Sequence, residues 1–229
     1  MKRTLLKTGD GSYTLHIPEW DEQYHSKHGA VAEALHVFIK EGLYYWSNKF
    51  SSNEISILEI GFGTGLNAFL TLIETQKNNV KVNYTGVEAY PLDISEIETL
   101  NYPSLLNASE EDFLKLHNTP WEIEPDGLQK QTVISENFSL TKQKKMFSEI
   151  TAENSYNLIY FDAFGIRVQP ELWTEAIFKI MFNALKPNGI LVTYAASGNA
   201  RRAMQAVGFA IERLPGPPGK REMLRGVKV

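Results

Sequence analysis

The stretch "ISILEIGFGTGLNA", residues 55–68, decides the fold of this 229-residue chain. It begins with an apolar run containing one acid, Glu59, and continues with glycine at positions 61, 63 and 65. Glycine lets the backbone turn tightly and approach a ligand closely. A helical pattern follows to about residue 76. The stretch therefore predicts a buried strand, a glycine turn and a helix.

Strands and helices alternate along the rest of the chain. Apolar runs predict strands at 80–88, 156–164 and 190–195, and residues 132–143 are also strand-like. Amphipathic patterns predict helices at 29–46, 170–185 and 198–209. The final segments, 210–215 and 222–229, flank "GPPGKR" and predict an antiparallel hairpin at the sheet edge. Alternation of this kind predicts an α/β, Rossmann-like fold with a mostly parallel sheet and a C-terminal antiparallel hairpin.

We predict one domain over residues 1–229. Residues 1–50 supply a hairpin and a helix that cover the site, and residues 55–229 form a doubly wound core with a variable insertion at about 92–130. On the helix at 29–46, the residues Glu33, His36 and Lys40 fall opposite the apolar face.

Composition excludes several classes of site. The chain has no cysteine, which rules out disulfides, thiolate metal sites and a cysteine nucleophile. Its five histidines show no metal-ligand spacing, so we predict no metal. The N-terminus has no apolar signal region, and no stretch approaches the roughly 18 apolar residues of a membrane span. We expect a cytoplasmic protein without a membrane partner.

Charge is distributed unevenly along the chain. The net charge is −4, yet residues 199–229 carry seven basic and only two acidic residues. A basic end on an acidic body fits docking to a polyanion, and it equally fits a solvated basic surface.

The glycine turn is the first candidate binding site, because ligands of a doubly wound sheet bind beside this turn. Its pattern is G-x-G-x-G with no Lys-Ser or Lys-Thr pair after it, which argues against a phosphate-binding P-loop. Glu88 ends the second strand, where a carboxylate accepts both hydroxyls of a ribose. Glu59 favours a cationic ligand. S-adenosylmethionine, with its sulfonium and ammonium, fits this site, and a purely structural turn is the alternative.

Asp162 is the candidate catalytic residue. It ends the predicted strand "LIYF", which lies beside the first strand, so its carboxylate faces the place where a methyl group leaves the cofactor. As a methyl group moves to an amine, a nearby carboxylate stabilises the developing ammonium and helps to remove its proton. Phe164 follows in "YFDAFG", where aromatic and small residues frame a flat base or an amine. A loop-capping aspartate is the bland alternative.

Several motifs together resemble one enzyme family. "EIGFGTGLN", "FDAF" followed by "PELW", "LKPNGILVTYAASGNARRAMQAVGF" and "GKREMLRGV" resemble the methyltransferase family of 5-methylaminomethyl-2-thiouridine biosynthesis in tRNA, whose fused form is the bifunctional protein MnmC. "DEQYHSKHGAVAEALHVF" and "PWEIEPDG" are also similar to that family. The resemblance covers nearly the whole chain, and its C-terminal half is specific to this family.

The resemblance implies a class I S-adenosylmethionine-dependent methyltransferase fold. It implies N-methylation of the 5-aminomethyl group of the wobble (2-thio)uridine, with the tRNA anticodon stem-loop as partner. Fused relatives also carry a flavin-dependent oxidase domain. Because this chain ends at Val229, we expect the stand-alone form, without FAD. As a separate expectation, the protein is a monomer.

The resemblance and the residue pattern together give the predicted site, in which Glu59, Phe62, Tyr24 and Phe164 come from the pattern and the others match positions of the family. The cofactor-binding set is Glu59, Gly61, Phe62, Gly63, Thr64, Gly65, Asn67 and Glu88. The substrate- and RNA-binding set is Tyr24, Phe164, Arg201, Arg202, Lys220 and Arg221. Asp162 is the acid at the reaction rim. The strand before it lacks the Gly-Asp pair that often holds the adenine, since "LTKQKKM" stands there.

Two rival functions remain open. A methyl- or aminopropyltransferase acting on a small free amine would use the same glycine turn and rim carboxylate, although the basic C-terminal segment argues against it. A non-catalytic RNA-binding module would have kept the fold without the chemistry, although Glu88 and Asp162 argue against that.

Overall fold

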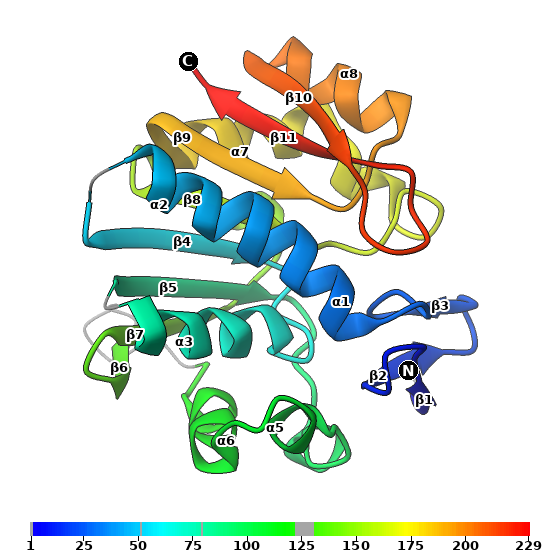
Figure 1. The fold of residues 1–229 in the computed structure, drawn as a ribbon. Helices are drawn as coiled ribbons and strands as arrows, with labels where there is room; N and C mark the ends of the chain where they lie inside the picture. Colours follow the sequence, from blue (N-terminus) through cyan, green and yellow to red (C-terminus); the bar gives the residue numbers. More distant parts are fainter. Residues whose placement is uncertain (1, 51, 79, 122–130) are drawn as a thin grey trace.

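An eight-stranded sheet runs through the centre of the molecule in the computed structural model, which describes residues 2–50, 52–78, 80–121 and 131–229 (Figure 1). In spatial order its strands are β10 (Phe209–Pro215), β11 (Glu222–Lys228), β9 (Leu185–Thr193), β8 (Tyr156–Phe161), β4 (Glu54–Ile60), β5 (Lys81–Glu88), β7 (Phe138–Lys144) and β6 (Gln131–Ser135).

The five central strands are parallel, and the strands at both edges are antiparallel. Ile57 of β4, for example, pairs with Tyr84 of β5 and Leu158 of β8. At one edge β11 runs antiparallel to β9, and β10 completes the predicted C-terminal hairpin. At the other edge β6 pairs antiparallel with β7. The strand-like region 132–143 is therefore a second hairpin, because a turn at residues 136–137 divides it.

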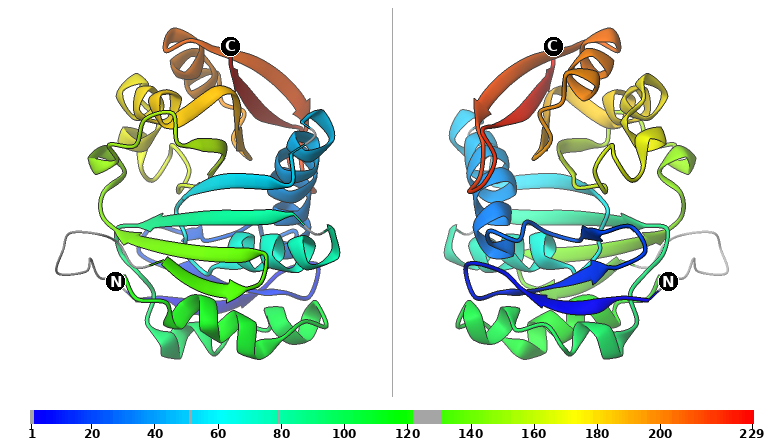
Figure 2. Two further views of the ribbon diagram at one scale, coloured as in Figure 1. Left: turned by 90° about the vertical axis from the view of Figure 1, so that its left-hand side faces the viewer. Right: turned by 90° about the vertical axis from the view of Figure 1, so that its right-hand side faces the viewer.

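Helices cover both faces of the sheet (Figure 2). One face carries a continuous helix formed by α1 (Ala30–Ala34), the π-helical η1 (Leu35–Tyr44) and α2 (Tyr45–Lys49), together with α3 (Leu66–Asn78), α4 (Ile94–Ile97), α5 (Tyr102–Leu105) and α6 (Glu110–Asn118). The opposite face carries α7 (Glu175–Ala184), α8 (Gly198–Ala206) and the 3₁₀ turns η2 (Phe147–Glu149) and η3 (Pro170–Trp173).

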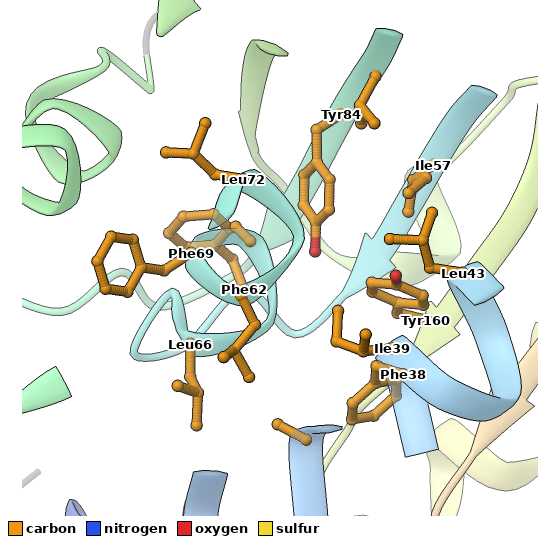
Figure 3. Packing of buried hydrophobic residues seen from close by; sticks show 14 of the residues in the cluster. Phe38, Ile39, Leu43, Ile57, Phe62, Leu66, Phe69, Leu72, Tyr84 and Tyr160 are labelled. Atoms are coloured by element: carbon orange, nitrogen blue, oxygen red, sulfur yellow. The ribbon is translucent and has the colours of Figure 1, made fainter. Parts of the chain in front are cut away.

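Strand β8 shows how the apolar pattern builds this three-layer core. Leu158 and Tyr160 face the layer of α1 and α3, whereas Ile159 and Phe161 face the layer of α7, and all four are fully buried. Figure 3 shows Tyr160 among apolar side chains of the long helix, β4 and β5. The prediction of a strand buried on both faces is confirmed, and burial of this kind is the main favourable term in folding.

The long helix differs from its sequence prediction at Glu33. The helical pattern placed Glu33 on the polar face, but the residue is buried, and only 6% of its side chain is exposed. The hairpin between β10 and β11 covers this part of the helix, where Lys220 reaches Glu33 and the Pro215 carbonyl lies 2.8 Å from His36 Nε2. Helix periodicity could not reveal this cover, because it comes from residues about 180 positions away in the chain.

A small sheet lies beyond the carboxyl ends of the parallel strands (Figure 1). It contains β1 (Thr4–Lys7), β2 (Tyr13–Ile17) and β3 (Glu22–Gln23), all antiparallel. The predicted N-terminal hairpin thus has a third, short strand. This placement brings the first 25 residues of the chain to the edge where the glycine turn opens.

Two predictions are not settled by this architecture. The single-domain division stays a prediction, and residues 122–130, which include most of "PWEIEPDG" and the end of the predicted insertion, lie outside the described residues. Within the described residues, no helix has both the length and the apolar character needed to cross a membrane.

Gly86 on β5 provides a test of the packing beneath the glycine turn. A Cβ at Gly86 would lie 2.4 Å from Cδ2 of Phe62, whose side chain is buried. Because overpacking a filled core forces neighbouring groups to move, Gly86→Ala should lower the free energy of unfolding by about 1–3 kcal/mol in urea denaturation. Gly165→Ala is the control, since its Cβ would meet only an ordinary contact at 3.7 Å. Equal stability of both variants would contradict this packing.

Candidate active site

A cavity of about 500 Å³ opens at the carboxyl ends of β4, β5 and β8, beneath the small N-terminal sheet. Ligand pockets for small molecules commonly have volumes of about 300–1,000 Å³. Most of the predicted site residues line it: Tyr24, Gly61, Phe62, Gly63, Thr64, Asn67, Glu88, Asp162 and Phe164. Glu59 and Gly65 do not line it, and neither do the four predicted basic residues of the C-terminal segment.

The three glycines of the turn serve the protein's own packing. All have positive φ, at 88°, 46° and 70° for Gly61, Gly63 and Gly65. A Cβ at Gly61 would lie 2.7 Å from the Asp162 carbonyl oxygen, and one at Gly65 would lie 2.7 Å from His117 Nε2. Gly61 and Gly63 both line the cavity, and a Cβ at Gly63 would lie 3.1 Å from Cδ1 of Tyr24. The turn therefore brings the backbone of Asp162 directly against the end of β4.

Glu88 is held at the cavity wall by two backbone donors. Its Oε2 accepts a hydrogen bond of 3.1 Å from the Gly63 N–H, and its Oε1 accepts one of 2.9 Å from the Tyr90 N–H. Each carboxylate oxygen has further lone pairs after these bonds. Glu88 therefore keeps lone pairs that can accept hydrogen bonds from hydroxyl groups in the cavity, and its contact with a ribose stays a prediction.

Asp162 is a half-buried carboxyl group at the floor of the cavity. Its backbone N–H donates to the Ile60 carbonyl at 2.9 Å, and its Oδ2 accepts from Asn67 Nδ2 at 2.8 Å. Burial and the negative charge of Glu33 raise the pKa of Asp162 to about 7, against the opposing effects of the Asn67 hydrogen bond and Lys220. Near neutral pH, Asp162 can thus both accept and release a proton.

The same Asn67 amide also contacts Glu59. Asn67 Nδ2 donates to Glu59 Oε1 at 3.0 Å, so one amide connects two acids. Glu59 is only 1% exposed, and burial and the nearby Asp162 raise its pKa well above the usual value. Glu59 does not line the cavity, although the sequence predicted that it contacts the cofactor. It is connected to the site through Asn67.

Aromatic rings from the N-terminal segment cover the cavity. The Phe164 ring meets Tyr24 and Trp20 edge-on, with centroids 5.0 and 5.7 Å apart. Arg167 Nη2 donates to the carbonyls of Trp20 and Asp21, at 3.0 and 2.7 Å. These bonds tie the loop after β8 to the N-terminal cover. Sequence reasoning missed Trp20 and Arg167, since only the tertiary structure brings residues 20 and 167 together.

A buried histidine also joins the cover to the glycine turn. His25 Nδ1 lies 2.9 Å from Thr14 Oγ1, and its Nε2 lies 3.4 Å from Thr64 Oγ1. Tyr102 donates to the same Thr64 hydroxyl at 3.3 Å. Burial lowers the pKa of His25 to about 4, so the ring is neutral at pH 7. Sequence reasoning missed His25. The only indication in the sequence was that it directly follows Tyr24, a predicted site residue.

An exposed apolar rim lies beside Glu88. Tyr90 follows β5 and is 62% exposed, and Met146 follows β7 and is 48% exposed. Both line the cavity, as do Phe147 and Ser148. This rim occupies the region for which the sequence offered no adenine-binding residue. Its signal was weak, because single exposed apolar side chains are common on protein surfaces.

The basic C-terminal segment separates into two groups. Arg213, Lys220 and Arg225 form salt bridges, and Lys228 donates to Asn154 and the Leu185 carbonyl. Arg225 is buried, where it pairs with Glu41 and Glu212. Within the described chain, the remaining three form no salt bridge: Arg201, Arg202 and Arg221.

Two of these three arginines act by charge on the same carboxylate. Arg201 at the start of α8 and Arg221 at the hairpin both act on Glu222, whose pKa is lowered mainly by its hydrogen bonds with Arg213 and also by these positive charges. The segment thus presents positive charge at one place, although fewer of its basic residues are available than the sequence indicated.

Comparisons with known proteins agree with this architecture. Residues 110–229 match the family described as S-adenosyl-L-methionine-dependent methyltransferase. The chain is 31% identical over 215 residues to the tRNA 5-methylaminomethyl-2-thiouridine biosynthesis bifunctional protein MnmC of Leptospira borgpetersenii, covering 90% of this chain and 32% of that protein. It is 27% identical to the protein of the same name from Magnetococcus marinus, covering 93% and 32%. The chain spans about a third of the length of these curated relatives.

Solved structures share the fold. The crystal structure of MNMC2 from Aquifex aeolicus superposes with a TM-score of 0.77 at 22% identity, covering 98% of this chain and 70% of that one. Spermidine synthase from Thermotoga maritima superposes with a TM-score of 0.55 at 14% identity, covering 100% and 72%. The Rossmann-like α/β prediction is confirmed. With a family match over more than half of its length, the chain belongs to the S-adenosyl-L-methionine-dependent methyltransferases.

Proposed function

We propose that this protein methylates the 5-aminomethyl group of the wobble (2-thio)uridine in tRNA, with S-adenosylmethionine as the methyl donor. The observation that carries the proposal is the half-buried Asp162 carboxyl group, which has a raised pKa and faces a cavity between the glycine turn and an aromatic cover. The substrate is inferred from the similarity to the MnmC proteins, and the positive charges of Arg201, Arg202 and Arg221 support a polyanionic partner.

The cavity has the features that the methyl donor requires. Glu88 offers carboxylate oxygens for ribose hydroxyls, and the adjacent apolar rim of Tyr90 and Met146 suits a flat base. Asp162 is the acid that lines the cavity floor, whereas Glu59 lies below it and does not line it. When bound, S-adenosylmethionine supplies a methyl group on a positively charged sulfur, and it leaves as a neutral thioether.

The residues of the site then handle the proton of the amine. An aliphatic amine has a pKa of about 10.4, so at neutral pH it arrives as an ammonium ion. Asp162, with a pKa of about 7, accepts that proton across a gap of about three pKa units, about half the gap for an ordinary aspartate. The nitrogen lone pair forms the new N–C bond as the S–C bond breaks. Asn67 keeps the Asp162 carboxylate in position during this exchange.

Three arginines supply the contacts to tRNA in this proposal. Arg201, Arg202 and Arg221 make no salt bridge within the described residues, and phosphate contacts by such side chains set affinity and orientation. The target uridine enters under the cover, where the rings of Trp20, Tyr24 and Phe164 offer apolar surface to an unstacked base.

Labelled methyl transfer tests the substrate directly. We expect label from S-adenosylmethionine on tRNA that carries the aminomethyl wobble uridine, and none on tRNA lacking that amine. Free polyamines serve as a second acceptor in parallel. Labelled polyamines with unlabelled tRNA would favour a small-amine transferase, and cofactor binding without any transfer would favour a non-catalytic RNA-binding module.

Asp162→Asn should uncouple chemistry from cofactor binding. Because the amide cannot accept the proton, methyl transfer should fall by at least about 10²-fold, with the affinity for S-adenosylmethionine nearly unchanged. In the unaltered enzyme, kcat/KM should rise as the pH increases through about 7, where Asp162 ionises, and the variant should lack this step. Single-turnover rates and calorimetry provide the two measurements. A variant with the normal rate would remove Asp162 from the mechanism.

The arginine contacts predict a specific dependence on salt. Arg201→Ala and Arg221→Ala should each weaken tRNA binding, and each should reduce the slope of log affinity against log salt by about 1. Lys81→Ala is the matched control, because Lys81 is an exposed cation at the opposite end of the parallel strands. Filter binding at several salt concentrations measures the slopes. Equal slopes for all three variants would place the tRNA on another surface.

A further inference from the structure

The tip of the C-terminal hairpin brings Lys220 behind Tyr194, a residue of the cavity wall. Lys220 Nζ lies 2.5 Å from Glu33 Oε2 and 3.7 Å from the centroid of the Tyr194 ring. Tyr194 lines the cavity, and Glu33 is almost fully buried. The positive charge of Lys220 is therefore already matched by groups of the protein, whereas Arg221, the next residue, is exposed.

Tyr194 connects Lys220 to the rim segment that carries Asp162. The Tyr194 hydroxyl donates to the Ala163 carbonyl at 2.8 Å. The neighbouring Phe164 carbonyl accepts from Trp173 Nε1, also at 2.8 Å, and the Trp173 and Tyr194 rings meet edge-on. Together with the Asp162 N–H bond to Ile60, these contacts fix the backbone of three consecutive rim residues.

Glu33 and Lys220 also act on Asp162 by charge, in opposite directions. The Glu33 carboxylate raises the pKa of Asp162, and the Lys220 ammonium lowers it. Glu33 is fixed in this position, because its Oε1 accepts the Ser26 N–H at 3.1 Å while its Oε2 binds Lys220. The titratable and charged groups that act on Asp162 or lie around it are Glu33, Glu59, Tyr84, Tyr102, Tyr194 and Lys220.

We propose that Lys220 is a positioning residue for methyl transfer, and not a phosphate contact. Its pairing with Glu33 balances the charge around Asp162, and its contact with Tyr194 supports the rim on which Asp162 stands. The inference rests on the proposed function for its substrate and deepens it. Two adjacent residues of the hairpin then have different roles: Arg221 faces the tRNA, and Lys220 acts on the surroundings of Asp162.

Variants of the ion pair test this role by the direction of their effects. Lys220→Met removes a positive charge, so the midpoint of the rise in kcat/KM with pH should move up by about one pH unit. Glu33→Gln removes a negative charge, so the midpoint should move down by a similar amount. The double variant should return close to the original midpoint, and Lys220→Arg should keep it. A purely structural role would lower activity in both single variants without opposite shifts.

Arg221→Met provides the matched control on the same hairpin. It should raise the KM for tRNA and leave the pH midpoint unchanged. Lys220→Met should do the reverse, with a changed midpoint and an unchanged salt dependence of tRNA binding. If Lys220→Met instead matches Arg221→Met in both measurements, Lys220 is a phosphate contact and the proposal is wrong.

A second readout needs no activity. Because folding raises the pKa of Asp162 above its unfolded value, its ionisation destabilises the folded protein as the pH rises from about 4 to about 7. We compare the unfolding free energy of each protein with that of its Asp162→Asn counterpart as a function of pH. The difference should stop changing at the pH that equals the pKa of Asp162 in the folded protein. This pH should rise in Lys220→Met. If this pH shifts in Lys220→Met but the enzyme does not methylate tRNA, only the proposed substrate is wrong. If tRNA is methylated but neither the kcat/KM midpoint nor the stability difference shifts, the role of Lys220 is wrong.

Discussion

The Asn67 amide, which donates hydrogen bonds to both Glu59 and Asp162, is the interaction on which the site depends. Glu59 and Asp162 end neighbouring strands, and two carboxylates at such close range cannot both carry full charge at low cost. Burial and the nearby Asp162 raise the pKa of Glu59 well above its usual value, and burial and Glu33 raise the pKa of Asp162 to about 7. The single amide holds Asp162 in place without supplying a positive charge that would lower its pKa strongly. A carboxyl group able to exchange a proton near pH 7 follows from this arrangement.

The backbone around Asp162 is constrained from several elements at once. The glycine turn packs against its carbonyl, and Tyr194 and Trp173 hold the next two carbonyls. The N-terminal cover is tied to the same rim through Arg167. Site precision therefore comes from contacts between segments that are distant in sequence, which is how reacting groups are held in productive geometry.

Charge on the C-terminal segment has two uses. Arg225 is buried against two carboxylates and the ring of Tyr45, and its role is to join the hairpin to the long helix. Lys220 faces inward, toward Glu33 and Tyr194. Arg201, Arg202 and Arg221 are what remains for a polyanion. The number of basic residues in the segment therefore overestimates the charge available to a polyanion, because several of them are already paired with carboxylates of the protein.

The sequence by itself determined that a strand, a glycine turn and a helix follow one another, that some strands are buried on both faces, and that the chain ends in a hairpin. These features follow from periodicity and glycine spacing, which are local properties of the chain. It also identified Glu88 and Asp162, since both end predicted strands whose carboxyl ends share one edge. Only the tertiary structure decided that Glu59 lies below the cavity, that Glu33 is buried, and that Lys220 faces inward. Each of these depends on a partner far along the chain, and local patterns carry no information about such partners.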